Sequence, residues 1–150
     1  MHNSEIIELI NNAWSWNGVF AAQIIQINEF GNIIFKSNND DYWRIYPEEL
    51  LIEKIANYKS EFETLKNTQD FKEDWEMKNL VKVAEKKLGK LEEGESYYFV
   101  IPAVIGGKYD KSNIQKIKSE ELISLSGDLA FQIKDLKDGQ KIRINIKKND

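Results

Sequence analysis

The chain offers few side chains for acid–base or nucleophilic chemistry at neutral pH. Its 150 residues include one histidine, His2, and no cysteine. Histidine exchanges a proton near pH 7 more readily than other side chains, but His2 lies beside the start of the chain, where backbones commonly fray. We therefore expect no serine–histidine–aspartate triad and no metal site built on histidine or thiolate ligands. The sequence predicts neither a metal nor any other cofactor.

Carboxylates remain as candidates for catalysis, and several acids are adjacent in the sequence. The pairs are Asp40-Asp41, Glu48-Glu49, Glu92-Glu93 and Glu120-Glu121. Adjacent side chains point to opposite sides of a strand and lie about 100° apart on a helix, so they rarely converge on one substrate atom. Solvated turns and helix starts explain these pairs better. We predict no catalytic residue and expect that the protein is not an enzyme.

Helical periodicity predicts the elements that carry many of these acids. Apolar residues at helical spacing predict helices over 4–14, from near 61, over 71–88 and over 119–136. Ser60-x-x-Glu63 and Asp70-x-x-Glu73 have the pattern of capping boxes and are expected to begin the two middle helices. Over 71–88 the apolar residues fall on two sides of the helix. This helix therefore either breaks near Lys78-Asn79 or is packed from two directions.

Shorter runs of β-branched and aromatic residues predict the strands. They lie over 23–28, 32–36, 42–46, 51–56, 95–101, 114–118 and 142–146. The turns between the first three runs are short enough for an antiparallel meander. We predict one α+β domain over residues 1–150, with a mostly antiparallel sheet and helices packed against it.

Acidic residues are concentrated around the predicted strand over 42–46. Between residues 40 and 53 five acids oppose only Arg44, which matches the whole-chain net charge of −4. Tyr42, Arg44 and Tyr46 share one face of this strand, so a hairpin here could present aromatic rings and carboxylates to a basic partner. The predicted partner-binding residues are Asp40, Asp41, Tyr42, Tyr46, Glu48 and Glu49. In the alternative interpretation the carboxylates keep a turn soluble, and Trp43 and both tyrosines belong to the core.

Charge and hydropathy argue against two further classes of partner. A net charge of −4 and a pI near 5.2 disfavour a general nucleic-acid-binding protein, which needs a basic face. No apolar stretch approaches the roughly 20 residues that a membrane span needs, and the first residues lack the pattern of a signal peptide. We expect a cytoplasmic protein that contacts neither nucleic acid nor a membrane.

Several strings of residues resemble those of one bacterial domain family. The strings are Glu29-Phe30-Gly31-Asn32, Tyr42-Trp43-Arg44-Ile45, Ile101-Pro102-Ala103-Val104-Ile105-Gly106-Gly107-Lys108-Tyr109-Asp110, and Gln132-Ile133-Lys134-Asp135-Leu136 before Asp138-Gly139. Together they resemble a domain long labelled as of unknown function and now associated with immunity proteins of type VI secretion DNase toxins. The resemblance extends from about Trp14 to Ile146. Full immunity proteins of this kind can carry an additional N-terminal domain, for which this chain has no room.

The resemblance implies a protein that acts by binding. It predicts a cytoplasmic immunity protein that neutralises a secreted antibacterial toxin, expected to be a basic nuclease, by steric or electrostatic blocking. An acidic inhibitor could mimic phosphates at the substrate groove of such a toxin. The alternative is a non-catalytic scaffold or ligand-binding module of the same domain family without a toxin partner.

Overall fold

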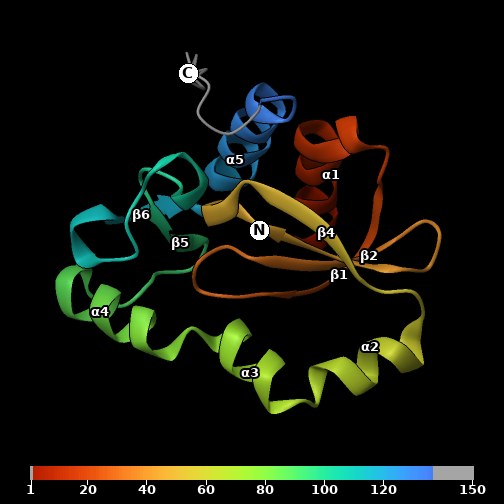
Figure 1. Ribbon diagram of the computed structural model, residues 1–150, viewed down its shortest axis with the longest axis horizontal. Helices are drawn as coiled ribbons and strands as arrows, with labels where there is room; N and C mark the ends of the chain where they lie inside the picture. Colours follow the sequence, from red (N-terminus) through yellow and green to blue (C-terminus); the bar gives the residue numbers. More distant parts are fainter. Residues whose placement is uncertain (1, 137–150) are drawn as a thin grey trace.

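An antiparallel sheet of four strands forms the centre of the computed structural model, which describes residues 2–136 (Figure 1). Its strands are β1 (Ala21–Ile27), β2 (Ile33–Ser37), β3 (Tyr42–Tyr46) and β4 (Leu51–Ala56), and they are paired in chain order. The predicted meander is confirmed and extends to the fourth strand. Short connections account for this order, since antiparallel neighbours need only a tight turn between them. The strand predicted over 142–146 lies outside the described residues.

Two helices cover one face of this sheet, α1 (Asn3–Trp14) and α5 (Ser119–Ile133) (Figure 1). Ile10 and Trp14 of α1 are fully buried against Phe35 and Ile45 of the sheet, as the helical spacing of the apolar residues requires. The two helices approach closely at Gly127, where an added Cβ would lie 2.6 Å from the carbonyl oxygen of Ala13. A glycine at this position therefore sets the distance between α1 and α5.

The opposite face of the sheet is covered by α2 (Lys59–Lys66) and α3 (Gln69–Glu76) (Figure 1). A separate apolar cluster forms there around Ile34, Tyr42, Phe62 and Trp75. The Tyr42 and Phe62 rings stack with centroids 4.5 Å apart. Since neighbouring strand residues point to opposite faces, Ile34 and Phe35 belong to different cores.

A second sheet lies beside the first and contains β5 (Glu95–Phe99) and β6 (Ile114–Lys118), which are antiparallel. The helix α4 (Lys78–Leu88) packs on it, and Phe30 from the β1–β2 turn stacks on Phe99 with centroids 5.2 Å apart. Short 3₁₀ turns complete the chain: η1 (Ser15–Asn17), η2 (Pro47–Glu49), η3 (Ala103–Ile105) and η4 (Lys111–Asn113). The arrangement confirms an α+β fold with antiparallel strands and packed helices.

Some predicted boundaries were wrong. The capping boxes do not form: α2 begins after Tyr58, and α3 begins after Thr68, whose hydroxyl accepts a hydrogen bond from the Phe71 N–H. The break expected near Lys78-Asn79 is confirmed and lies at Met77, which has a left-handed backbone with φ of 47°. The break directs α3 onto the larger sheet and α4 onto the smaller one. It explains why the apolar residues of this stretch fall on two sides.

Candidate partner-binding surface

Five acidic side chains line an open groove of about 540 Å³ at the junction of η2, β4 and α3. We call it the acidic groove. Its acids are Glu48, Glu49, Glu53, Glu73 and Asp74. They come from three separate segments, which β3 and the α3–α4 break bring to the same place. Arg44 lines the floor of the groove, and Tyr46 and Tyr109 line its walls.

A buried guanidinium organises the floor. The Arg44 residue is 1% exposed, and its Nη1 donates a hydrogen bond of 2.6 Å to an Asp74 carboxylate oxygen. Its Nε and Nη2 donate to Asn32 Oδ1 at 3.1 and 2.9 Å. The guanidinium carbon also lies 4.2 Å from the Tyr46 ring centroid and 5.0 Å from that of Trp75. A planar cation held by a carboxylate, an amide and two rings keeps this part of the surface rigid.

Glu48 is the buried acid of the groove, at 5% exposure. Asn32 Nδ2 donates hydrogen bonds to both of its carboxylate oxygens, at 3.1 and 2.9 Å. Burial raises the pKa of Glu48 to about 7, although the hydrogen bonds from its own backbone N–H and from Asn32 and the charge of Arg44 act in the opposite direction. This carboxyl group therefore changes its protonation state near neutral pH.

The exposed acids of the rim are held by tyrosine hydroxyls. The Tyr46 hydroxyl donates to Glu53 Oε1 at 2.6 Å, and the Tyr109 hydroxyl donates to Glu49 Oε1. Burial and these carboxylates raise the pKa of both tyrosines well above the ordinary value. The phenols thus stay neutral donors that orient Glu49 and Glu53, while both acids remain exposed to a partner.

The structure brings together three of the six predicted contact residues and separates the other three. Tyr46, Glu48 and Glu49 line the acidic groove. Asp40 and Asp41 lie at the other end of β3, in the turn from β2. Tyr42 is 5% exposed and stacks on Phe62, so its ring has almost no surface for a partner. A contact role for the exposed members of the set stays a prediction.

The two aspartates of the β2–β3 turn have partners within the chain. Asp40 pairs with Lys36 at 3.3 Å. Asp41 accepts a hydrogen bond from Trp43 Nε1 at 2.7 Å and another from the Ser37 hydroxyl, and it pairs with Lys54 at 3.2 Å. Burial acts to raise the pKa of Asp41, but these hydrogen bonds and Lys54 together lower it. Asp41 therefore has a structural role in the turn, while Asp40, whose side chain is 82% exposed, stays a predicted contact residue.

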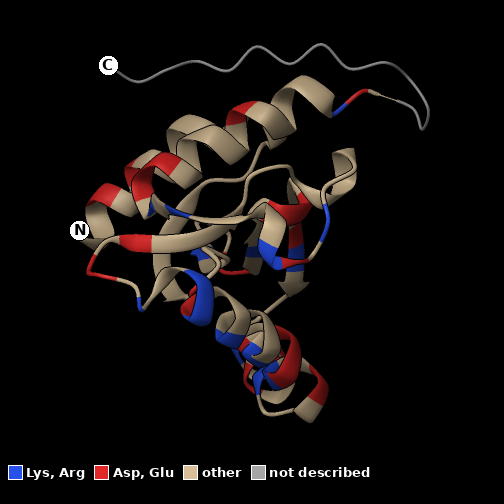
Figure 2. Cartoon of the chain, turned by 90° about the vertical axis from the view of Figure 1, so that its left-hand side faces the viewer, with Lys and Arg blue, Asp and Glu red and all other residues tan. Residues whose placement is uncertain are grey.

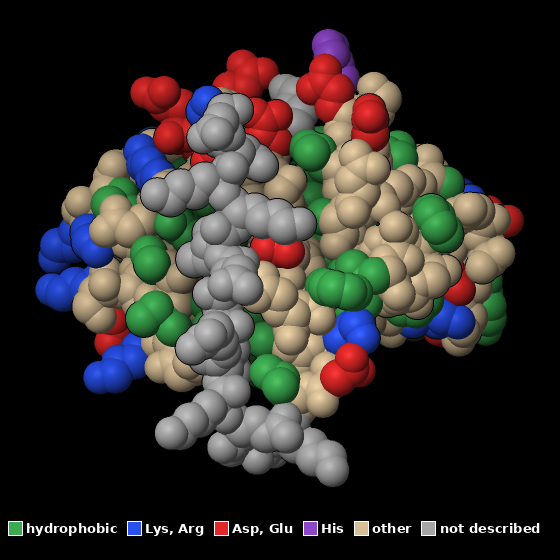
Figure 3. All heavy atoms as spheres, turned by 90° about the horizontal axis from the view of Figure 1, so that it is seen from above, with side chains coloured by type: hydrophobic (Ala, Val, Ile, Leu, Met, Phe, Trp, Pro, Cys, Tyr) green, Lys and Arg blue, Asp and Glu red, His purple; other side chains and the backbone are tan. Residues whose placement is uncertain are grey.

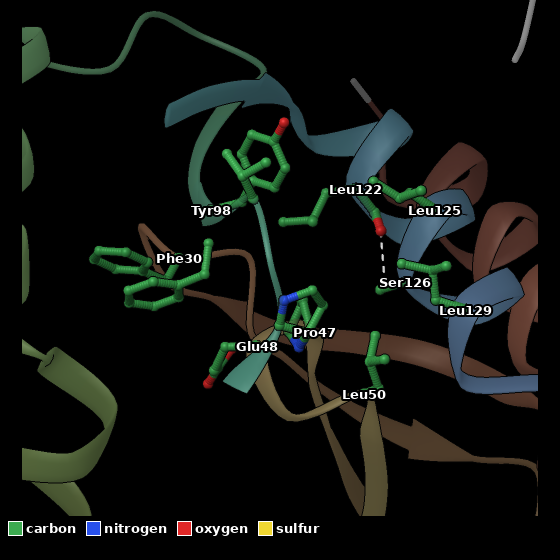
Figure 4. Close-up of a pocket in the computed structure, with 12 residues that line it drawn as sticks. Phe30, Pro47, Glu48, Leu50, Tyr98, Leu122, Leu125, Ser126 and Leu129 are labelled. Atoms are coloured by element: carbon green, nitrogen blue, oxygen red, sulfur yellow. Dashed lines mark hydrogen bonds between the residues drawn. The ribbon is translucent and has the colours of Figure 1, made fainter. Parts of the chain in front are cut away.

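A second, enclosed pocket lies behind η2 and is too small for a ligand (Figure 4). Its free volume of about 20 Å³ is roughly that needed for one water molecule. In Figure 4 the leucine side chains of α5 face Pro47 and Leu50, while the Glu48 carboxylate points away from them. The pocket lies between η2 and α5. The ionisable group of this region, the Glu48 carboxylate, belongs to the acidic groove.

Charge on the outer surface is segregated in some places and mixed in others. Figure 2 shows Lys and Arg interspersed with Asp and Glu on the lower helices, and acids at the start of the upper helix. Seen from the side of α1 and α5, acidic side chains gather at one edge and basic ones at another, with hydrophobic side chains between them (Figure 3). Neither view shows a continuous basic stripe among the described residues.

The described part of the chain contains neither a candidate metal site nor a membrane-spanning helix. Residues 2–136 contain no group of three or more histidine, cysteine or acidic residues that could hold a metal ion. Within the same residues no helix is both long and apolar enough to cross a membrane.

A family model described as "T6SS immunity protein Tdi1, C-terminal" matches residues 56–130, which are half of the chain. The chain belongs to this family of type VI secretion system immunity proteins. The family expected from the sequence is thereby confirmed. No curated protein matched the chain.

The fold of this immunity-family chain is similar to that of a solved protein. The crystal structure of Atu4351 from Agrobacterium tumefaciens aligns with a TM-score of 0.56 and 13% sequence identity. The alignment covers 85% of this chain and 64% of the other. At this identity the likeness concerns the fold alone, and the chain spans about 64% of the length of the protein it matches.

Sequence reasoning missed several groove residues of the immunity-family chain. Glu53 faces Arg44 in the β3–β4 register, and this pairing could have been predicted from a short turn after Tyr46. Asp74 and Tyr109 carry no such local signal, since they lie 30 and 60 residues from their partners Arg44 and Glu49. The family match begins at residue 56, so the groove combines segments inside and outside the matched region.

Proposed function

We propose that this chain is a non-enzymatic, cytoplasmic immunity protein that binds and neutralises a secreted antibacterial toxin by covering it. Membership of the type VI secretion immunity family supports a toxin partner. The acidic groove supports a basic one, because a surface with this charge attracts lysine and arginine side chains and speeds their encounter. The chain acts as one functional domain over residues 1–150.

The toxin is proposed to be a nuclease. A nuclease binds a polyanion and therefore carries positive charge around its substrate groove. Rim carboxylates of Glu49 and Glu53, oriented by tyrosine hydroxyls, can occupy the positions where substrate phosphates would bind. Electrostatic occupation of this kind needs no reacting group on the inhibitor. The acids, the tyrosines and the structural arginine of the groove, which lie beside Leu51, Met77 and Leu80, can act through charge and contact alone.

Co-expression with the toxin encoded by the neighbouring gene tests the function. We expect cells that make the toxin to survive when this chain is present and to die when it is absent. Equal death in both cultures would refute the immunity role. Duplex DNA added to the purified pair tests the nuclease assignment, since DNA should compete with this chain for an inactive form of the toxin.

A charge-reversal pair tests the surface. Glu49→Lys with Glu53→Lys should slow association with the inactive toxin and reduce its salt dependence, because two exposed rim charges change sign. Glu92→Lys with Glu93→Lys is the matched control, since it makes the same charge change at exposed positions before β5. Equal effects of the two double variants would place the interface outside the groove.

A further inference from the structure

The connection between β5 and β6 exposes large hydrophobic side chains in succession. Val100, Ile101 and Val104 are 48%, 52% and 53% exposed. We call residues 100–107 the apolar loop. Scattered exposed apolar residues are ordinary on protein surfaces, but a group in one loop is typical of a contact site when the loop has a fixed shape.

The backbone of the apolar loop is fixed by one buried side chain. Asn113, 8% exposed, accepts a hydrogen bond from the Ile101 N–H at 2.8 Å through its Oδ1. Its Nδ2 donates to the carbonyl oxygens of Ile101 and Lys108 at 2.8 and 3.0 Å. The Asn113 carbonyl oxygen also accepts from the Val100 N–H at 2.8 Å. Both ends of the loop are thus tied to a single residue of η4.

Close packing at a glycine restricts the loop further. The Gly107 N–H donates to the Pro102 carbonyl oxygen at 3.0 Å. A Cβ on Gly107 would lie 1.7 Å from the Ile101 carbonyl oxygen, so only glycine fits beside it. Pro102 is buried beneath the loop, whereas the side chains of Ile101 and Val104 face outward. The fold needs the buried proline and the glycine, but it does not explain the outward hydrophobic residues.

The apolar loop adjoins the acidic groove. Tyr109, just after the loop, packs its ring edge-on against Phe99 with centroids 4.9 Å apart and donates its hydroxyl to Glu49 on the groove rim. The turn η2, which carries the groove acids Glu48 and Glu49, is in contact with η3, which carries Val104. One surface therefore combines a rigid apolar part with an acidic part, as in interfaces that have an apolar centre and a charged rim.

We propose that the apolar loop is the hydrophobic anchor of the toxin interface, with Ile101 and Val104 inserted into an apolar depression flanked by basic residues of the toxin. This inference rests on the proposed function. The charge of the acidic groove favours a basic toxin over a second copy of this chain. In a symmetric dimer through this surface, the groove acids of one copy would lie close to those of the other and repel them. A basic partner gains attraction at the groove and apolar burial at the loop together.

The test is the double variant Ile101→Ser with Val104→Ser, bound to an inactive form of the toxin encoded by the neighbouring gene. We expect dissociation to become at least roughly 20-fold faster, with association and its salt dependence nearly unchanged, because apolar anchors act mainly on the dissociation rate. The matched control is Val83→Ser, which removes a valine that is 38% exposed on α4. Unfolding midpoints equal to that of the wild type would show that both variants are folded.

The outcomes separate this inference from the proposed function. A folded double variant that dissociates as slowly as the wild type overturns the anchor and leaves the immunity role intact. A wild type that does not bind the toxin overturns both. A wild-type dimer in sedimentation that the double variant abolishes would assign the loop to a second copy instead.

Discussion

The Arg44 guanidinium and the Asp74 carboxylate meet at 2.6 Å although 30 residues separate them in the sequence. Their side chains differ greatly in exposure, at 2% for Arg44 and 64% for Asp74. The pair joins β3 to α3, and it holds the Arg44 guanidinium at the base of the acidic groove. The two partners should therefore contribute very unequally to stability.

Replacing Arg44 should destabilise the fold much more than replacing Asp74. Arg44→Met leaves the buried Asn32 Oδ1 without its donor, and we expect a loss of about 3 kcal/mol in the free energy of unfolding. Asp74→Asn removes only an exposed charge and should cost about 1 kcal/mol or less. Urea unfolding at constant pH measures both values. Equal losses of unfolding free energy in the two variants would mean that the hydrogen bonds from Arg44 to Asn32 do not stabilise the fold.

Glu48 should make stability depend on pH. Its pKa lies at about 7 in the folded chain, above the ordinary value of 4.5, so the folded state holds the proton that the unfolded state has lost. The free energy of unfolding should therefore fall as the pH rises from 5 to 8, by up to roughly 3 kcal/mol.

The variant Glu48→Gln isolates this effect. Glutamine keeps an oxygen acceptor for Asn32 but cannot ionise, so the fall between pH 5 and pH 8 should largely disappear. Denaturant unfolding at several pH values measures the difference between the two proteins. Parallel curves for wild type and variant would show that Glu48 does not titrate in this range.

Gly127→Ala should destabilise the chain although alanine is the better helix former. Alanine gains about 1 kcal/mol of helix propensity, but its Cβ would lie 2.6 Å from the Ala13 carbonyl oxygen and push α1 away from α5. We expect a net loss of roughly 2 kcal/mol in thermal or urea unfolding. Gly94→Ala separates the two possible costs of an added methyl group, since its Cβ meets open space but its backbone, with φ of 81°, is strained for alanine.

Gly107→Ala should loosen the apolar loop with a smaller effect on global stability. The new methyl group must displace the Ile101 carbonyl oxygen, which also accepts a hydrogen bond from Asn113. Hydrogen exchange at the Ile101 and Gly107 amides should become at least roughly 10-fold faster. Lys108→Ala, which changes an exposed side chain next to it, should leave these exchange rates unchanged.

Local patterns predicted the fold better than they predicted the site. Alternation and helical spacing located β3, β4 and α1 within about a residue, because these patterns report which face is buried. The capping boxes failed because α2 and α3 each begin two residues earlier, and Thr68 supplies the cap of α3. The first residue of each helix depends on the path of the backbone after β4, and the spacing of apolar residues carries no information about that path.

The acidic groove could be predicted only in part. Glu48 and Glu49 are adjacent in the sequence, yet η2 buries the first and exposes the second. The composition around β3 indicated an acidic surface, and only the alternative interpretation placed Tyr42 in the core, where the structure has it. Asp74 and Tyr109 reach the groove through tertiary packing, and Asp40 and Asp41 belong to the far end of the same strand.

Phe30 sits in the turn of the larger sheet but packs between Tyr97 and Phe99 of the smaller one, and the Tyr97 N–H donates to the Glu29 carbonyl oxygen at 2.8 Å. Neither sheet can lose its order without exposing this ring to water. Heating should therefore melt both sheets in one calorimetric peak, and the groove and the loop should be lost together with them.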